Sequence, residues 1–430
     1  MTLPLDHPRR QEFNDEVHAR PPETLQAPLH LSYLALFAEG AQRQQGWDCV
    51  AALTARFGVA SPPTDAHHFS ADLGPFRVKC ERHTEFLRFA FIVPGGADDP
   101  FAEPAIGLVP VDWLATLPGQ VIVASNVGLL RAGDEEPAFE SLAQRFFAGN
   151  DLVGASIGAG AAFAVTDFRI HPDGFSRALV LDRSMTPRQA GRSVARLMEI
   201  DTYRILSLMA LPIARGLAPS LNACERELTE ITRLLVAARD ADEPLLFERL
   251  TRLEAEIEST LSQNLHRFSA AAAYDDLIHR RIAELREERL AGMQTFREFT
   301  DRRLAPAMNT CRTTALKLES LSQRVARATQ LLTTRVEITR EGQSQRLLES
   351  MDRRAGLQLR LQETVEGLSV AAITYYIVGL VGYVAKGLKA AGAPLDIEIV
   401  MAISIPIVAV LAGLGIRHIR RSVAEEQHST

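Results

Sequence analysis

The stretch Thr374–Leu388, TYYIVGLVGYVAKGL, holds one charged residue, Lys386, in a chain of which 23% of the residues are charged. It lies within an apolar segment, residues 368–388, and a second segment, residues 399–416, carries no charge at all. Helices of these lengths reach roughly 27 to 31 Å at 1.5 Å per residue, which matches the hydrocarbon thickness of a bilayer. The sequence therefore predicts two transmembrane helices.

The connection between the two segments is short and contains Gly392 and Pro394, so we expect a tight hairpin. A buried helix pair in a soluble domain is the alternative, but the two lengths and the flanking arginines favour membrane spans. The arginines on the two outer flanks are Arg353, Arg354, Arg360, Arg417, Arg420 and Arg421. Because basic residues gather on the cytoplasmic side, we expect both termini in the cytoplasm, at the inner membrane of a bacterium.

One side of the first segment differs from a plain leucine anchor. The candidate pore or helix-interface residues are Thr374, Tyr375, Tyr376, Gly379, Gly382, Tyr383 and Lys386. Glycines allow membrane helices to approach closely, and hydroxyl groups find partners across such contacts. Two interpretations stay open: an interface or pore between subunits, or an anchor whose glycines pack the hairpin.

The residues before the spans have helical periodicity. A stripe with steps of three and four comprises Leu318, Leu321, Val325, Ala328, Leu332 and Val336, and a second comprises Leu246, Leu250, Leu253, Ile257, Leu261, Leu265 and Phe268. No proline occurs between Pro306 and Pro394, so a helix from about Asn309 into the first span would measure roughly 120 Å. Thr186, followed by Pro187 and Gln189, predicts a capped helix start. Such stripes pack within one chain or between subunits, and the pattern leaves both open.

The first 185 residues are richer in strands. RVKCERHTEFLRFAFIV alternates, VIVA at 121–124 is a short apolar strand, and AAFAVTDFRI-HPDG-FSRALVLDR predicts two strands about a Pro-Asp-Gly turn. Residues 44–57 and 137–147 are expected to be helical, so a mixed or antiparallel sheet carrying helices is predicted.

The predicted fold class is therefore an α+β or α/β N-terminal cytosolic domain, a long-helix middle region and a two-helix transmembrane hairpin, mainly α overall. The predicted domains are residues 1–185, a helical region at 186–366, the hairpin at 367–417 and a basic, then polar tail at 418–430.

Composition excludes several function classes. The net charge is −6 and only four of the 47 basic residues are lysine, so we expect no nucleic-acid partner. Cys49, Cys80, Cys224 and Cys311 have neither disulfide-framework nor zinc-site spacing, and no cofactor motif is present. Gly154-Ala-Ser156-Ile-Gly158 matches the nucleophile elbow of hydrolases, but a strand is predicted after it where an elbow needs a helix. We expect no enzyme, no cofactor and no bound metal.

A polar cluster near the N-terminus comprises Asp15, Glu16, His18 and Arg20. These residue types could bind a metal ion or an anion, whereas a network of structural salt bridges is the alternative that we favour. Pro21 and Pro22 end any helix at this point.

Several segments carry a family resemblance: HPRRQEFNDEVHARPPE, HFSADLGPFRVKCERHTEF, TDFRIHPDGFSR, LDRSMTPRQAGR and MDRRAGLQLRLQETVEGLSVAAITYYIVGLVGYVAKGLKAAG. They resemble a bacterial family of predicted membrane-anchored proteins of unknown function, over nearly the whole chain. The resemblance implies the membrane hairpin and no activity. The plan of a cytosolic domain, long helices and two C-terminal spans is also similar to that of CorA-type cation channels, although their Gly-Met-Asn signature is missing.

We therefore expect a membrane-anchored homo-oligomer on a CorA-like plan that associates through its helical region and first span and passes an ion or a solute. The alternative is a non-transporting membrane-tethered scaffold or sensor whose cytosolic domain binds a ligand or partner.

Overall fold

The computed structural model describes residues 5–18, 22–96, 98–133, 137–237, 242–391, 394 and 396–427. The described chain forms two compact units: one contains the residues up to Ala237 together with Pro244–Thr329, and the other the residues from Gln330 onward. The fold class is as predicted, with a sheet domain, long helices and an apolar hairpin. The predicted boundaries at residues 185 and 366 stay predictions.

The first unit contains one eight-stranded sheet in the order β2-β3-β4-β1-β5-β8-β7-β6. Its strands are β1 (Leu29–Phe37), β2 (His68–Asp72), β3 (Arg77–Arg82), β4 (Phe86–Pro94), β5 (Gln120–Arg131), β6 (Val153–Ile157), β7 (Ala162–Thr166) and β8 (Ser176–Asp182). All neighbouring pairs are antiparallel except β5 and β8, so the sheet is mixed, as predicted. The two strands predicted about the Pro-Asp-Gly turn are β7 and β8.

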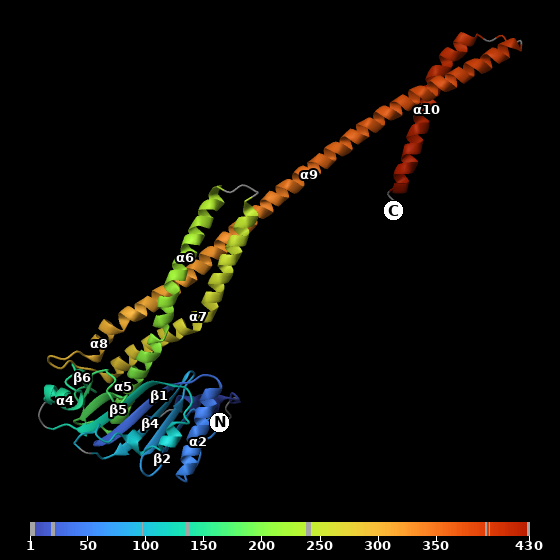
Figure 1. The fold of residues 1–430 in the computed structure, drawn as a ribbon. Helices are drawn as coiled ribbons and strands as arrows, with labels where there is room; N and C mark the ends of the chain where they lie inside the picture. Colours follow the sequence, from blue (N-terminus) through green and yellow to red (C-terminus); the bar gives the residue numbers. More distant parts are fainter. Residues whose placement is uncertain are drawn as a thin grey trace. The chain divides into compact units, whose positions relative to one another are not determined.

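Alternation along β1 divides the core into two faces. Leu31, Tyr33 and Ala35 belong to one cluster with helix α5, whereas Leu34 and Leu36 belong to another with Trp47 and its helix α2. Helices therefore cover both faces of the sheet, with α2 and α5 on opposite sides (Figure 1). Besides the long helices, the first unit contains α1 (Arg10–His18), α2 (Ala41–Arg56), η1 (Ala105–Leu108), α3 (Val111–Leu114), α4 (Phe139–Phe146), α5 (Pro187–Leu208) and α8 (Phe296–Arg303).

Helix α5 begins as the sequence predicts. The Thr186 side chain accepts a hydrogen bond from the backbone N–H of Gln189, and the backbone N–H of Thr186 donates to Gln189 Oε1, which completes a capping box. The long helices that follow are α6 (Ala210–Ala237), α7 (Glu243–Leu285), α9 (Ala305–Ala390) and α10 (Ile397–Gln427).

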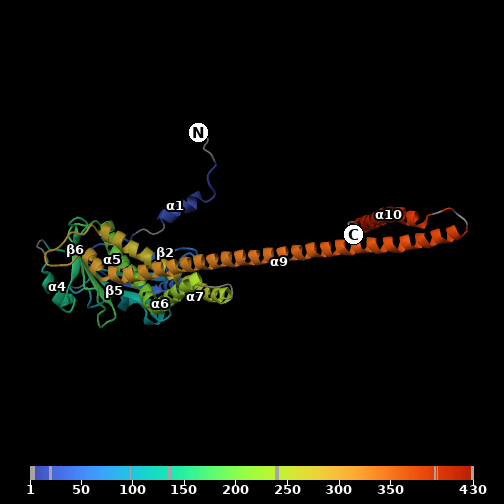
Figure 2. The ribbon, with the colours of Figure 1, turned by 90° about the horizontal axis from the view of Figure 1, so that it is seen from above.

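In the first unit α6, α7 and the start of α9 form a three-helix bundle. Glu225 of α6 pairs with Lys317 Nζ of α9 at 2.7 Å, and Glu227 of α6 pairs with Arg249 of α7 at 2.8 Å. The stripe residues Leu318, Leu321 and Val325 are buried, so this part of the predicted stripe packs inside the chain. Figure 2 shows the same helices from above.

In the second unit α9 continues unbroken past Gly342 and Gly356 to Ala390, and α10 lies alongside its last part (Figures 1 and 2). Among the described residues, three helical segments are, by length and composition, able to cross a membrane: Pro187–Ala237, Ala305–Ala390 and Ile397–Arg417. The apolar residues of the first, such as Val194, Leu206 and Ala210, pack into the core under the sheet. The other two contain the predicted spans, residues 368–388 (the first span) and 399–416 (the second span).

Candidate functional site

The first span has two different sides. Val378, Gly382 and Ala385 are buried and Thr374 is half-buried, and these four recur at intervals of four, four and three residues, which places them on one side of the helix. Gly382 contacts Met401 of α10, so this side packs inside the hairpin. Gly379, by contrast, has no neighbour within 4 Å of where a Cβ atom would stand. The two glycines, expected on one shared face, thus have separate environments.

The other predicted residues form what we call the tyrosine face: Tyr375, Tyr376, Gly379, Tyr383 and Lys386. The three tyrosine side chains are 78%, 71% and 75% exposed in the single chain. The rings of Tyr375 and Tyr376 meet edge to face at 5.9 Å, and Lys386 Nζ lies 5.9 Å from the centre of the Tyr383 ring. This face is therefore available to lipid or to another protein chain.

Two of these tyrosines lie near the middle of the predicted first span, a position that is unusual for tyrosine in a transmembrane helix. Tyr375 and Tyr376 lie within about 5 Å of the midpoint of the first span along the helix axis, at 1.5 Å per residue. Tyrosine normally collects at the two membrane–water interfaces, where its hydroxyl group reaches water. In hydrocarbon an unpaired hydroxyl group costs several kcal/mol, about 4 to 8 on the harshest scale. If the first span crosses a membrane, these two hydroxyl groups require a hydrogen-bonding partner from outside the hairpin or from a water-filled lumen.

The N-terminal polar cluster lies on and after α1. Asp15 is exposed and accepts a hydrogen bond from Gln11 Nε2 at 2.8 Å, one turn earlier on the same helix. Glu16 and His18 belong to α1, but their side chains and Arg20 lie outside the described part of the chain. Within the described residues, no group of three or more His, Cys, Asp and Glu side chains is placed to hold a metal ion.

A buried ion-pair network, which the sequence did not predict, lies between the sheet and the helices. Glu81 of β3 is 1% exposed and pairs with Arg88 of the neighbouring strand β4. It also pairs with Lys79 Nζ of its own strand at 3.0 Å. Arg88 also reaches Glu199 of α5 at 3.1 Å, and Glu199 pairs with Arg281 of α7. The network thus joins three layers of the first unit.

The buried charges of this network stabilise one another in their ionised forms. Burial on its own raises the pKa of Glu81, but Arg88, His83 and Lys79 outweigh it, and the pKa of this carboxyl lies far below its ordinary value. The signal in the sequence was a charged residue at an inward position of an apolar strand, since Arg88 stands between Leu87 and Phe89. Strand alternation alone does not say which charges will meet.

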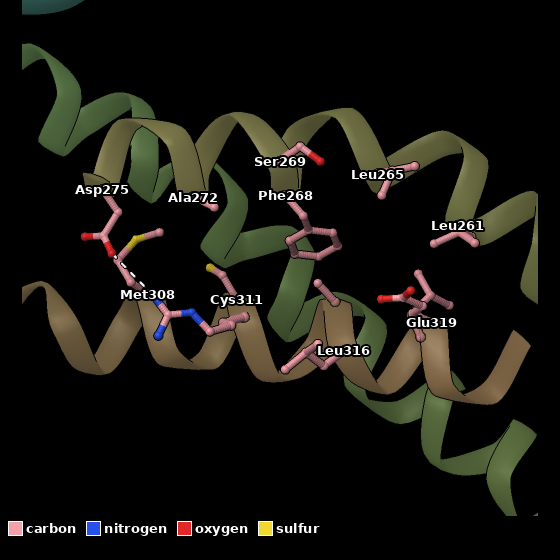
Figure 3. A pocket seen from close by; sticks show the side chains of 13 residues that line it. Leu261, Leu265, Phe268, Ser269, Ala272, Asp275, Met308, Cys311, Leu316 and Glu319 are labelled. Atoms are coloured by element: carbon pink, nitrogen blue, oxygen red, sulfur yellow. Dashed lines mark ion pairs between the residues drawn. The ribbon is translucent and has the colours of Figure 1, made fainter. Parts of the chain in front are cut away.

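A cavity of about 360 Å³, also not predicted from the sequence, lies between α7 and α9 in the first unit. Figure 3 shows the side chains of the two helices that line it, with Phe268 near its middle. The walls are largely apolar, and Asp275 of α7 and Arg312 of α9 face each other at one end, 3.7 Å apart. Leu261 and Leu265 of the predicted α7 stripe line this cavity, so their part of the stripe borders open space instead of forming a closely packed seam.

Asp275 is the polar group of this cavity that is most removed from water. It is 7% exposed, and its Oδ1 atom accepts no hydrogen bond from the described residues. His279 Nδ1 stands 3.9 Å from that oxygen and instead bonds the backbone carbonyl oxygen of Asp275 at 2.8 Å. Burial raises the pKa of Asp275, and His279 and Arg312 offset this only in part.

The hydrolase-like motif has no elbow geometry. Ser156 is buried within strand β6, and its backbone N–H donates to the carbonyl oxygen of Glu288. Asp167 and His171 do meet, with Oδ2 and Nε2 2.9 Å apart, and Asn150 also donates to Asp167 Oδ2. An elbow would place the serine in the turn after a strand, so the arrangement of Ser156 does not match one.

Comparison with known proteins bears on the chain as a whole. The family described as "Protein of unknown function (DUF3422)" matches residues 5–423. The chain belongs to the DUF3422 family. This confirms the predicted family of unknown function, and the family description names no activity, ligand or partner.

Other comparisons add no function to this DUF3422 protein. None of the proteins of curated function matches the chain. One solved structure, described as "structure of the full-length CmaX protein", is 14% identical and covers 69% of this chain and 89% of its own, with a TM-score of 0.18. That likeness is too low to carry an argument, and none of the comparisons supports the CorA-like plan.

Proposed function

We propose that the chain is a two-span protein of the bacterial inner membrane that works as a homo-oligomer, with both termini in the cytoplasm. In this proposal the tyrosine face of the first span forms the contacts between subunits and lines a passage for ions or small solutes. No catalytic step is part of it.

The observation that carries the proposal is that the two sides of the first span have different contacts. The side with Gly382 is occupied by the second span, whereas the tyrosine face has no described partner although Tyr375 and Tyr376 lie at mid-membrane depth. A subunit interface or a water-filled lumen supplies the hydrogen bonds that hydrocarbon cannot. Lys386, near the loop end of this face, gives the passage a positive charge that disfavours cations.

Flux through liposomes tests the passage. We expect purified protein in liposomes to conduct small anions better than cations, and Lys386→Asn to raise cation flux severalfold. Lys389→Asn is the comparison, because it removes the same charge one turn closer to the loop, beyond the end of the first span, where we expect a smaller effect on flux. A monomeric protein with no flux in either form would rule the passage out.

The cavity beside Asp275 favours a second candidate, a membrane-tethered receptor. Its volume is within the range of small-molecule sites, about 300 to 1,000 Å³, and a buried carboxylate oxygen without a donor suits a ligand that has an apolar body and an amine. Thermal-shift measurements with alkylamines test this candidate. Stabilisation of the parent protein but not of Asp275→Asn would support it, and equal shifts in both proteins would exclude it.

A further inference from the structure

The part of α9 just before the first span exposes a row of large apolar side chains. Leu357, Leu361, Val365 and Leu368, which we call the apolar seam, are 60%, 70%, 56% and 73% exposed. Charged residues such as Arg360, Glu363 and Glu366 lie between them, as in a helix surrounded by water. A contiguous apolar row of this kind in water marks an interaction surface.

The apolar seam and the tyrosine face are one continuous surface. From Leu357 the row runs through Leu361, Val365, Leu368, Ala372, Tyr375, Gly379, Tyr383 and Lys386, at steps of four, four, three, four, three, four, four and three residues; all of these positions are exposed except Gly379, which is half-buried. At about 100° per residue all nine stay within roughly 40° of a single line along the helix.

The repeat in this surface is 11 residues long. Leu357, Leu368 and Gly379 are 11 residues apart, and so are Leu361, Ala372 and Tyr383. An 11-residue repeat corresponds to about 3.67 residues per turn, which keeps a pair of helices in contact with little supercoiling or a slightly right-handed one. Toward the N-terminus the same line meets Ser350 and Arg354, so the surface ends at Leu357.

The hairpin leaves this surface free. The second span packs on Thr374, Val378 and Gly382, on a different side of α9. Residues of α10 such as Ile403, Pro406 and Ile407 are exposed and do not cover this surface of α9. The exposed row crosses from an aqueous segment into the membrane, so its partner must do the same.

We propose that residues 357–386 of α9 pair with the same residues of a second copy of this chain, in parallel and in register. This inference rests on the proposed function and extends the subunit interface beyond the membrane. All copies enter the membrane in the same direction, so their first spans can only associate in parallel. In a parallel, in-register pair Gly379 faces Gly379, which permits close approach, and each tyrosine lies beside a tyrosine of the other copy.

Single cysteines placed in membranes of expressing cells test the pairing. We expect Leu361→Cys and Tyr383→Cys, in the full chain with its native cysteines replaced by alanine, to form disulfide-linked dimers upon mild oxidation. Leu359→Cys and Val384→Cys are matched controls, since both positions are exposed and apolar but lie on the opposite side of α9. A disulfide requires Cα atoms within about 7 Å, so we expect at least fivefold more dimer at the first two positions.

The outcomes separate this inference from the proposed function. Dimer at Tyr383→Cys without dimer at Leu361→Cys would overturn the extended seam and leave the membrane interface standing. Equal cross-linking on both sides of the helix, or none at any position, would overturn both.

Discussion

Gly382 of the first span lies against Met401 of the second, and a Cβ atom at Gly382 would stand 3.1 Å from Met401 Sδ. The contact is with the far end of a flexible side chain, so a single methyl group can be accommodated, whereas a large side chain cannot. The same helix presents Gly379 to open space three residues earlier.

The two glycines should therefore respond differently to substitution. We expect Gly382→Ala to cost less than about 1 kcal/mol and Gly382→Leu to loosen the hairpin by about 1 to 3 kcal/mol, as overpacking does. Gly379→Leu should leave the hairpin intact and separate the subunits. Mass photometry gives the oligomeric state of each variant, and limited proteolysis of the loop reports the hairpin. A monomer from Gly382→Leu together with an oligomer from Gly379→Leu would contradict the assignment.

Acid should destabilise the sheet domain through Glu81. The pKa of this carboxyl is lowered in the folded state, so its contribution to stability is complete above the ordinary carboxyl pKa of about 4.3 and is lost as the pH falls below it. Fluorescence of Trp47 and Trp113, the two tryptophans of the chain and both buried in one core cluster, reports unfolding of this domain.

Substitution of Arg88, the partner of Glu81, tests whether this ion pair causes the acid sensitivity. Arg88→Met alone leaves a buried carboxylate uncompensated, and we expect a loss of about 3 to 5 kcal/mol at pH 7. The double variant Glu81→Gln, Arg88→Met should recover most of that stability and flatten the dependence on pH below about 5. An unchanged acid profile in the double variant would show that other carboxylates cause the loss.

Asp275 should affect the pH dependence of stability in the opposite direction to Glu81. Burial raises its pKa, so the folded state holds this proton more tightly than the unfolded chain, and stability falls as the pH rises through the raised pKa. Asp275→Asn removes this loss, and we expect a higher melting temperature at pH 7 and a smaller difference at pH 4. The exposed neighbour Asp276 gives the control Asp276→Asn, for which no change is expected. A lower melting temperature for Asp275→Asn would show that its pairing with Arg312 outweighs burial.

Gly191 of α5 should tolerate no side chain. A Cβ atom there would stand 1.6 Å from the carbonyl oxygen of Glu23, whose segment crosses the start of the helix. We expect Gly191→Ala to destabilise the sheet domain by about 1 to 3 kcal/mol. Gly216→Ala, at a helical position with open space around it, should instead stabilise by about 0.5 to 1 kcal/mol. Chemical denaturation followed by tryptophan fluorescence measures both, and similar values for the two variants would refute the close contact.

Local features of this fold were predictable because each rests on neighbouring residues. The Thr186 capping box, the β7–β8 hairpin about Pro172-Asp173-Gly174 and the unbroken helix from Asn309 to the first span all follow from patterns a few residues long. The parallel pairing of β5 with β8 was not predictable, because strand alternation fixes the buried face of a strand and not its neighbour.

The same limit applies to the candidate site. Spacing places Tyr375, Gly379, Tyr383 and Lys386 along one side of a helix, but it does not say where around that helix the second span will pack. Glu81 and Arg88, and likewise Asp275 and Arg312, come from different strands or helices, and only tertiary structure brings them together.

Because the apolar hairpin follows the sheet domain in the sequence, it is synthesised after that domain. The larger core cluster under the sheet takes its last residue from Cys311, more than 50 residues before the first span begins. During synthesis from the N-terminus, at about 5 to 20 residues per second, the sheet domain can therefore be folded before the first span leaves the ribosome. In the proposed topology a folded domain of this size stays on the side of the membrane where it was synthesised, and the short loop of the hairpin is the part that crosses.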